Sequence, residues 1–271
     1  FYTFMDGAQP NTNPIPCICV PSTYRTPFVF TNSVPITDSR SNQIKLMKVQ
    51  KNLCKLVLYD PNTSLSLSAN QKTTIAIELI AMAVEAYLSQ KANFFSDMFV
   101  EKGLELLTYA LDGSPSLDIT TPEEILFAQA GTMISLATTS SSLGLSSMLS
   151  LTINSRYKML KSLVSSILLP YMIEDVVKYK STKIAKLAKI MKCVQKDEAE
   201  TLSEEELCKA FIDSVRERIA KANLPTRLKD LNLTIEQLSL AVEDVKEIDF
   251  VNTLPRSMST DDIFDFIKLA Y

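Results

Sequence analysis

Apolar and polar positions change their spacing along this chain near residue 68. Before that point the apolar residues form short β-branched runs separated by Pro, Asn and Thr, a pattern typical of strands and loops. Beyond it, apolar residues recur at intervals of three and four, as they do on one face of an α-helix. We therefore expect helices throughout the later part. Strands are predicted over 15–20, 28–31, 44–49 and 53–59.

Capping residues mark the expected helix starts. A hydroxyl residue followed three positions later by Glu or Gln forms a capping box, and this pattern begins at Thr121, Ser203 and Thr234. Pro122 adds the proline typical of a first helical position, and either Ser259 or Thr260, followed by Asp261 and Asp262, marks a similar acidic first turn. The resulting helices are predicted over 70–91, 95–111, 121–139, 157–177, 180–193, 203–222, 234–246 and 259–270.

Composition allows one large or two small globular domains. The chain has 271 residues, of which 46% are hydrophobic and 22% charged. No apolar run reaches the length of about 18 residues that a membrane span needs, so no span is predicted. The net charge of −3 gives no overall attraction to nucleic acid or anionic lipid. Nucleic acid is therefore excluded from the expected partners.

Two rare residue types restrict the chemistry. The sequence has no histidine, which excludes His-based general bases, Ser-His-Asp triads and His-ligated metal sites within this polypeptide. Its 5 glycines are too scattered for a phosphate-binding loop. Both features argue against catalysis.

The 5 cysteines form an odd, scattered set, which favours free thiols and an intracellular, reducing compartment. Cytoplasm and a mitochondrion-like organelle both remain open. Cys17 and Cys19 form a C-x-C pattern without a second pair, for which two neighbouring strand thiols are favoured over a metal site. Because the sequence begins at Phe1, we expect a processed chain or a fragment.

Several short segments follow one another in a recognisable order. They are Pro21–Val29, Leu58–Pro61, Glu85–Tyr87, Asn93–Asp97, Leu168–Pro170 and Leu224–Asp230. The series resembles the iron-containing (group III) alcohol dehydrogenases, whose matching motifs are P-T-T-x-G-T-G-S-E, V-D-P, H-A-x-E-A-Y, N-P-x-S-D, A-x-L-L-P and G-I-P-x-x-L-x-D. Phe4–Asp6 is similar to a segment of the bifunctional aldehyde/alcohol dehydrogenases, so the resemblance covers nearly the whole chain.

The resemblance implies a mainly α fold of two parts. Residues 68–271 correspond to the all-helical, dehydroquinate synthase-like C-terminal domain of the family. Residues 1–67 correspond to a small β-rich remnant of the Rossmann-like nucleotide-binding domain, and the family's Gly-Gly-Gly-Ser dinucleotide motif is missing from the sequence. Short strands without crossover helices cannot form a buried parallel sheet, so we expect them to pair with another segment.

In this family an Asp and a His one helical turn apart, with two later histidines, hold the iron or zinc that polarises the alcohol oxygen. The resemblance places these ligands on Glu78, Met82, Ser147 and Lys161, and a further family histidine on Leu151. A carboxylate, a thioether, a hydroxyl and an ammonium do not form an iron or zinc site, so metal binding is expected to be lost. Lys161 is expected to pair with Glu78 in place of the metal; alternatively, both side chains turn to water.

The cofactor loop of the family is also altered. Arg25 and Pro27 replace two glycines that let the backbone approach the dinucleotide, and Phe28-Val29 replaces a Ser-Glu pair. We expect no bound cofactor, and we expect Arg25 at the surface or in an interface rather than on a phosphate. The degenerate loop comprises Ser22, Thr23, Tyr24, Arg25, Thr26 and Pro27.

Two regions are candidate docking surfaces for other protein subunits. The first is residues 1–60, whose strands need a partner. The second is the lysine-rich segment Lys178–Lys192, where a solvated helix face is the simpler interpretation and docking to an acidic surface the functional one. Its candidate docking lysines are Lys180, Lys183, Lys186 and Lys189.

The preferred function is that of a non-catalytic pseudoenzyme, retained as a structural or scaffolding subunit of a larger assembly. The alternative is a working NAD(P)-dependent alcohol dehydrogenase split over two chains, in which a partner brings the nucleotide domain. A homodimer whose N-terminal strands complete each other's sheet is a third interpretation.

Overall fold

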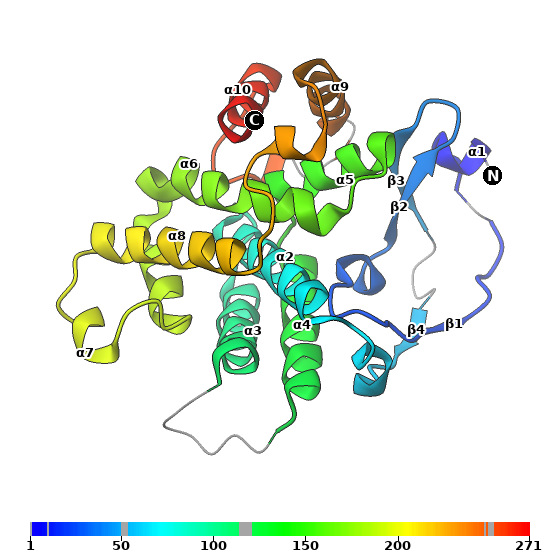
Figure 1. Ribbon diagram of the computed structural model, residues 1–271. Coiled ribbons are helices and arrows are strands. Elements are labelled where there is room, and N and C mark those ends of the chain that lie inside the picture. The colour runs from blue at the N-terminus through cyan, green and yellow to red at the C-terminus, as the bar shows by residue number, and fades with distance from the viewer. Residues whose placement is uncertain (1, 10, 50–53, 114–120, 247, 249–251) are drawn as a thin grey trace.

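The computed structural model describes residues 2–9, 11–49, 54–113, 121–246, 248 and 252–271 (Figure 1). Helices dominate, as the sequence predicts. Their bounds are α1 Tyr2–Met5, α2 Ala69–Leu88, α3 Phe94–Asp112, α4 Glu123–Ser140, α5 Leu145–Tyr157, α6 Lys161–Ile190, α7 Lys196–Ala199, α8 Glu204–Lys221, α9 Ile235–Val245 and α10 Thr260–Ala270. The domain boundary expected after residue 67 stays a prediction.

Helix α2 lies at the centre of the helical part, where it contacts α3, α4, α5 and α6 (Figure 1). Every residue from Thr74 to Leu88 is buried, so this helix is covered on all sides. A side chain between Thr74 and Leu88 is therefore isolated from bulk water. The polar residues of this helix must find partners within the protein.

The capping boxes at Ser203, Thr234 and Ser259 form, and each begins a predicted helix. The box predicted at Thr121 is wrong, because α4 begins at Glu123 without a side-chain cap. Helix α5 was not predicted; it is buried along almost its whole length and carries no one-sided apolar stripe. The predicted break in the long helix α6 falls at Lys180, where φ is −140°.

Strands form two small sheets in the N-terminal part. Strand β1 (Cys17–Cys19) pairs in parallel with β4 (Cys54–Val57), and β2 (Ser33–Asp38) pairs antiparallel with β3 (Gln43–Lys48). The strand predicted over 28–31 is wrong: a 3₁₀ turn, η1, covers Pro27–Phe30 with proline at its first position. Strand β2 was not predicted, and it contains Pro35, a residue type that is rare in central strands.

The N-terminal elements lie along one side of the helical part (Figure 1). The turns η1 and η2 (Pro61–Ser64) pack on α4, and β3 packs on α5. Tyr24 is buried and stacks on Phe127 of α4, with their ring centroids 5.2 Å apart. The degenerate loop is thereby fixed against the helices.

No helix in the described part of the chain combines the length and hydropathy that a bilayer crossing requires. All the cysteines carry free thiols, as expected. The reducing intracellular compartment stays a prediction.

Candidate functional site

The positions that match the family's metal ligands lie on three helices around the centre of the protein. Glu78 and Met82 lie one turn apart on α2, and both are buried. Ser147 lies in the first turn of α5, and Lys161 is the first residue of α6. The degenerate loop approaches the same region through Arg25.

Arg25 forms an ion pair with Glu78: its Nη1 atom donates a hydrogen bond to the Oε2 atom of the carboxylate. The Glu78 side chain is 9% exposed and that of Arg25 is 23% exposed, so the pair is largely removed from water. Burial lowers the pKa of Arg25, although a guanidinium stays protonated at neutral pH. The loop arginine thus neutralises the carboxylate at the metal position.

This geometry corrects two expectations. Glu78 was expected to pair with Lys161, whereas Arg25 is its partner. Arg25 was expected at the surface or in an interface, yet it reaches the buried carboxylate. Both errors have one physical cause. The sequence does not show that the loop packs against α4, and this packing brings the Arg25 guanidinium to Glu78, where Lys161 was expected.

Lys161 is half-buried and makes no hydrogen bond or ion pair with any residue that the structure describes. Burial lowers the pKa of Lys161, and the positive charge of Arg25 lowers it further. Its place at the N-terminus of α6 also disfavours a cation, because the helix dipole is positive there. The surroundings of Lys161 therefore disfavour an additional positive ion.

Ser147 is engaged with a different carboxylate. Its backbone N–H donates to Oε1 of Glu85 over 2.9 Å, and its hydroxyl donates to Oε2. Glu85 is fully buried on α2, and burial raises its pKa while the hydrogen bonds from Ser147 oppose that shift. The carboxylate lies where it satisfies free N–H groups at the start of α5. Ser147 thus belongs to a helix-capping network.

The donor atoms at these positions do not suit Fe²⁺ or Zn²⁺. The single carboxylate is engaged by Arg25, the hydroxyl by Glu85, and the ammonium of Lys161 has no lone pair to offer while protonated. Met82 contributes only a thioether, which hard divalent cations disfavour.

The degenerate loop uses its polar groups within the protein. The backbone N–H of Thr26 donates to Oγ of Ser135 over 3.3 Å, and the Thr26 hydroxyl bonds the hydroxyl of Tyr59. Gly131 of α4 lies so close to the loop that a Cβ there would be 2.2 Å from the carbonyl oxygen of Tyr24. This close packing fixes the loop against α4, and the backbone N–H of Thr26 is used within the protein.

A cleft of about 420 Å³ runs beside this loop. Its walls include Phe28 of η1 and Thr138 of α4, with Lys48 and Lys91 at other points of the lining. None of the positions matching the metal ligands lines this cleft. The cleft and the Arg25–Glu78 pair are therefore separate features.

The predicted docking face on α6 is partly used within the chain. The Lys183 ammonium contacts the Asp97 carboxylate at 2.9 Å and donates to the carbonyl oxygen of Tyr87 over 2.8 Å. Lys186 pairs with Glu101 at 2.6 Å. Lys180 lies at the helix break and Lys189 is exposed. A docking role for this face stays a prediction, with fewer free lysines than expected.

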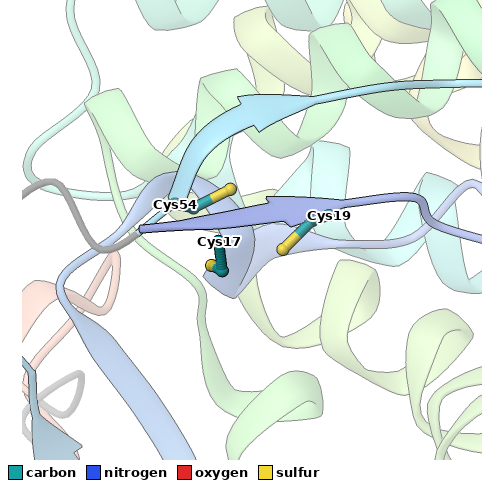
Figure 2. Close-up of side chains that lie close together, drawn as sticks. All are labelled: Cys17, Cys19 and Cys54. Carbon is teal, nitrogen blue, oxygen red and sulfur yellow. The ribbon is translucent and has the colours of Figure 1, made fainter. Parts of the chain in front are cut away.

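One cluster was missed from the sequence. Strand pairing places Cys54 beside Cys17 and Cys19, and the three sulfur atoms lie within 4.8 Å of one another (Figure 2). The C-x-C pattern alone gave only a pair of neighbouring strand thiols. The sequence could have indicated the third cysteine, because Cys54 lies near the start of the strand predicted over 53–59 and that strand pairs with the C-x-C strand.

A model of the Fe-containing alcohol dehydrogenase family, C-terminal region, matches residues 73–271. Lactaldehyde reductase of Escherichia coli (strain K12) is 20% identical over 268 residues, which cover 98% of this chain and 69% of the relative. For 1,3-propanediol dehydrogenase of Citrobacter freundii the identity is 21% over 266 residues, covering 98% of this chain and 68% of the relative.

Solved structures agree with this assignment of the fold. The crystal structure of 1,3-propanediol oxidoreductase superposes with a TM-score of 0.86 at 20% identity, covering 100% of this chain and 70% of that chain. Alcohol dehydrogenase from Oenococcus oeni gives the same TM-score, identity and coverage. Because the family model covers well over half of the sequence, this chain belongs to the iron-containing alcohol dehydrogenase family.

Proposed function

We propose that this chain is a non-catalytic member of its family that serves as a structural subunit of a larger protein assembly. The ion pair between Arg25 and Glu78 carries the proposal, because it joins the altered cofactor loop to the altered metal position. Arg25 stands where the family has a loop glycine. The same Arg25 side chain pairs with Glu78, the only carboxylate among the four positions that match the family's metal ligands. The proposed loss of cofactor binding and the proposed loss of metal binding are therefore linked through one side chain, that of Arg25.

Charge supports the same proposal. Arg25 pairs with the single carboxylate, Glu78, and the positive charge of Arg25 together with burial lowers the pKa of Lys161, so a second cationic side chain lies within electrostatic reach of Arg25. A divalent cation brought there would meet a net positive surrounding within a region of low dielectric. Metal binding at these positions is therefore proposed to be lost.

The exposed sheet of β1 and β4 supports docking through the N-terminal region. Parallel strands occur almost only in sheets whose two faces are covered. Within the described residues, however, these strands pair only with each other, and Ile18 and Leu56 are 64% and 51% exposed. We propose that another protein subunit covers this apolar sheet.

Catalysis is tested on the natively purified assembly. Oxidation of short-chain alcohols is measured with NAD⁺ and with NADP⁺, and the iron and zinc contents are measured for the wild-type chain and for Glu78→Ala. We expect no turnover above the protein-free rate and equal metal contents in the two preparations. Turnover, or an ion lost in Glu78→Ala, would overturn the proposal and support the split dehydrogenase.

Docking is tested by Ile18→Lys, with Leu269→Lys as the matched control. Both residues are leucine-like in size and both are 64% exposed, but Leu269 lies on α10, away from the sheet. We expect Ile18→Lys to reduce the mass of the native assembly and Leu269→Lys to preserve it. Equal masses in both variants contradict docking through this sheet. The mass of the recombinant chain in solution, without other subunits, tests for a homodimer. If the wild-type chain is a dimer and Ile18→Lys is a monomer, a second copy of this chain covers the sheet.

A further inference from the structure

The cysteines of β1 and β4 form a compact group of sulfur atoms outside the family's metal positions. Cys17 and Cys19 lie two residues apart on β1, and Cys54 begins the adjacent strand (Figure 2). Alternate residues of a strand share a face, so Cys17 and Cys19 project to the same side. Cys54 is the direct partner of Cys17 in the parallel ladder.

An irregularity in the strand pairing assembles this group. The register shifts between Cys17 and Ile18, so that Lys55 has no partner and Leu56 lies opposite Ile18. A bulge of this kind redirects side chains locally. The outcome is that all three sulfur atoms lie within 4.8 Å of one another.

This spacing suits a thiolate-bound ion. Zinc bonds a thiolate sulfur at about 2.3 Å, and a tetrahedral angle then separates two sulfurs by about 3.8 Å. Small side-chain rotations bring sulfurs that lie within 4.8 Å to that separation. Each of the three residues is half-buried, so an ion can reach the sulfurs from solvent.

The Cys19 thiol must lose its proton before its sulfur can ligate an ion. Hydrogen bonding with Cys54, together with burial, raises the pKa of Cys19 to about 11. Neighbouring sulfurs disfavour negative charge on one another when no cation is present. A cation bound between them reverses that effect, since it stabilises the thiolates that ligate it.

We propose that Cys17, Cys19 and Cys54 form a binding site for one thiophilic d¹⁰ cation, Zn²⁺ or Cu⁺. Three thiolates without histidine or carboxylate select soft ions over Mg²⁺, Ca²⁺ or Fe²⁺. Zn²⁺ takes a fourth ligand such as water, whereas Cu⁺ is satisfied by the three sulfurs. The ion connects β1 to β4 and so stabilises a two-stranded parallel sheet that is too small to be stable alone.

The test uses the full chain, purified and reduced without oxygen. Co²⁺ serves as the spectroscopic substitute for Zn²⁺, because thiolate ligation gives it a charge-transfer absorption, and Zn²⁺ is then added to displace it. Cu⁺ is titrated separately against a chromophoric chelator. We expect one equivalent of Zn²⁺ or of Cu⁺ to bind, and the arm that binds at the lower concentration identifies the ion.

Serine variants locate the site. Cys17→Ser, Cys19→Ser and Cys54→Ser are each expected to weaken binding at least about 100-fold. Cys193→Ser is the control, since Cys193 is also half-buried but lies outside the group. Circular dichroism confirms that each variant keeps the helical content of the wild-type chain.

The outcomes are distinct from those of the proposed function. If neither Zn²⁺ nor Cu⁺ binds at one equivalent, the proposed site is wrong. It is also wrong if the ion binds Cys54→Ser as tightly as the wild-type chain. Formation of a Cys17–Cys54 disulfide that persists under the reducing conditions also overturns it. Glu78→Ala leaves this binding unchanged, so loss of binding in that variant contradicts the assignment to the cysteines.

Discussion

At the scale of single residues, the central feature is a charge pair formed by segments distant in sequence. We predict that Arg25→Met lowers the free energy of unfolding by about 1–3 kcal/mol, because it leaves the Glu78 carboxylate buried without a partner. The double variant Arg25→Met/Glu78→Leu should recover most of that loss, since it removes both charges. Urea denaturation at neutral pH measures both values, and equal losses in the single and double variants would contradict the pairing.

Lys161 gives a prediction on pH dependence. Its pKa is lower in the folded protein than in the unfolded chain, first through burial and then through Arg25. Between those two pKa values the unfolded chain binds more protons, so the stability contributed by this group rises with pH across that alkaline window. Below the window, the buried ammonium lowers stability.

We therefore predict that Lys161→Met raises the free energy of unfolding at neutral pH and that this gain shrinks towards pH about 10. Lys209→Met is the control, because Lys209 is an exposed residue of α8. Denaturant titrations at both pH values measure the difference. A gain for Lys161→Met that is the same at neutral and alkaline pH would show that lost charge is not its cause.

At the scale of elements, features set by residues close together in the sequence could be predicted. Features set by contacts between distant segments could not. The caps at Ser203 and Thr234 depend on residues three positions apart, so the sequence contains all that determines them. Helix α5 depends on burial by its neighbours and lacks a one-sided stripe. The partner of Glu78 was missed for a similar reason, because Arg25 is 53 positions away and reaches α2 only after the loop has packed.

Gly131 determines how closely that loop packs on α4. A Cβ at this position would lie 2.2 Å from the carbonyl oxygen of Tyr24, so Gly131→Ala forces the loop away from the helix. We predict a loss of about 1–3 kcal/mol in the free energy of unfolding, despite the better helix propensity of alanine. Gln129→Ala, at an exposed position of the same helix, should be neutral or slightly stabilising. Thermal and urea denaturation of both variants measure the contrast.

At the scale of the whole molecule, Asp244 joins three separate regions. Its carboxylate accepts a hydrogen bond from Gln43 of β3 over 2.8 Å and another from Nη2 of Arg156 in α5 over 2.8 Å, while the residue itself lies in α9. Only 1% of the Asp244 side chain is exposed. This buried carboxylate is thus one of the attachments of the N-terminal hairpin to the helices, beside the hydrogen bonds that Ser155 of α5 makes to Thr37 and Asn42.

We predict that Asp244→Ala lowers the free energy of unfolding by about 2–4 kcal/mol, because it leaves the Arg156 guanidinium without its partner. Asp175→Ala is the comparison: its pair with Arg256 is more exposed, and a smaller loss is expected. Limited proteolysis of the β2–β3 hairpin provides a second measurement. Similar losses for both variants would argue against a linking role for Asp244.

The position of Arg25 has a consequence for any attempt to build the family's histidine-ligated metal site into this chain. Introducing histidines through Met82→His, Ser147→His and Lys161→His would leave the guanidinium engaged with Glu78. The loop would still hold a fixed positive charge where an incoming ion needs a free carboxylate. Building such a site therefore requires a simultaneous change at Arg25, and substitutions at the four ligand positions alone are not enough.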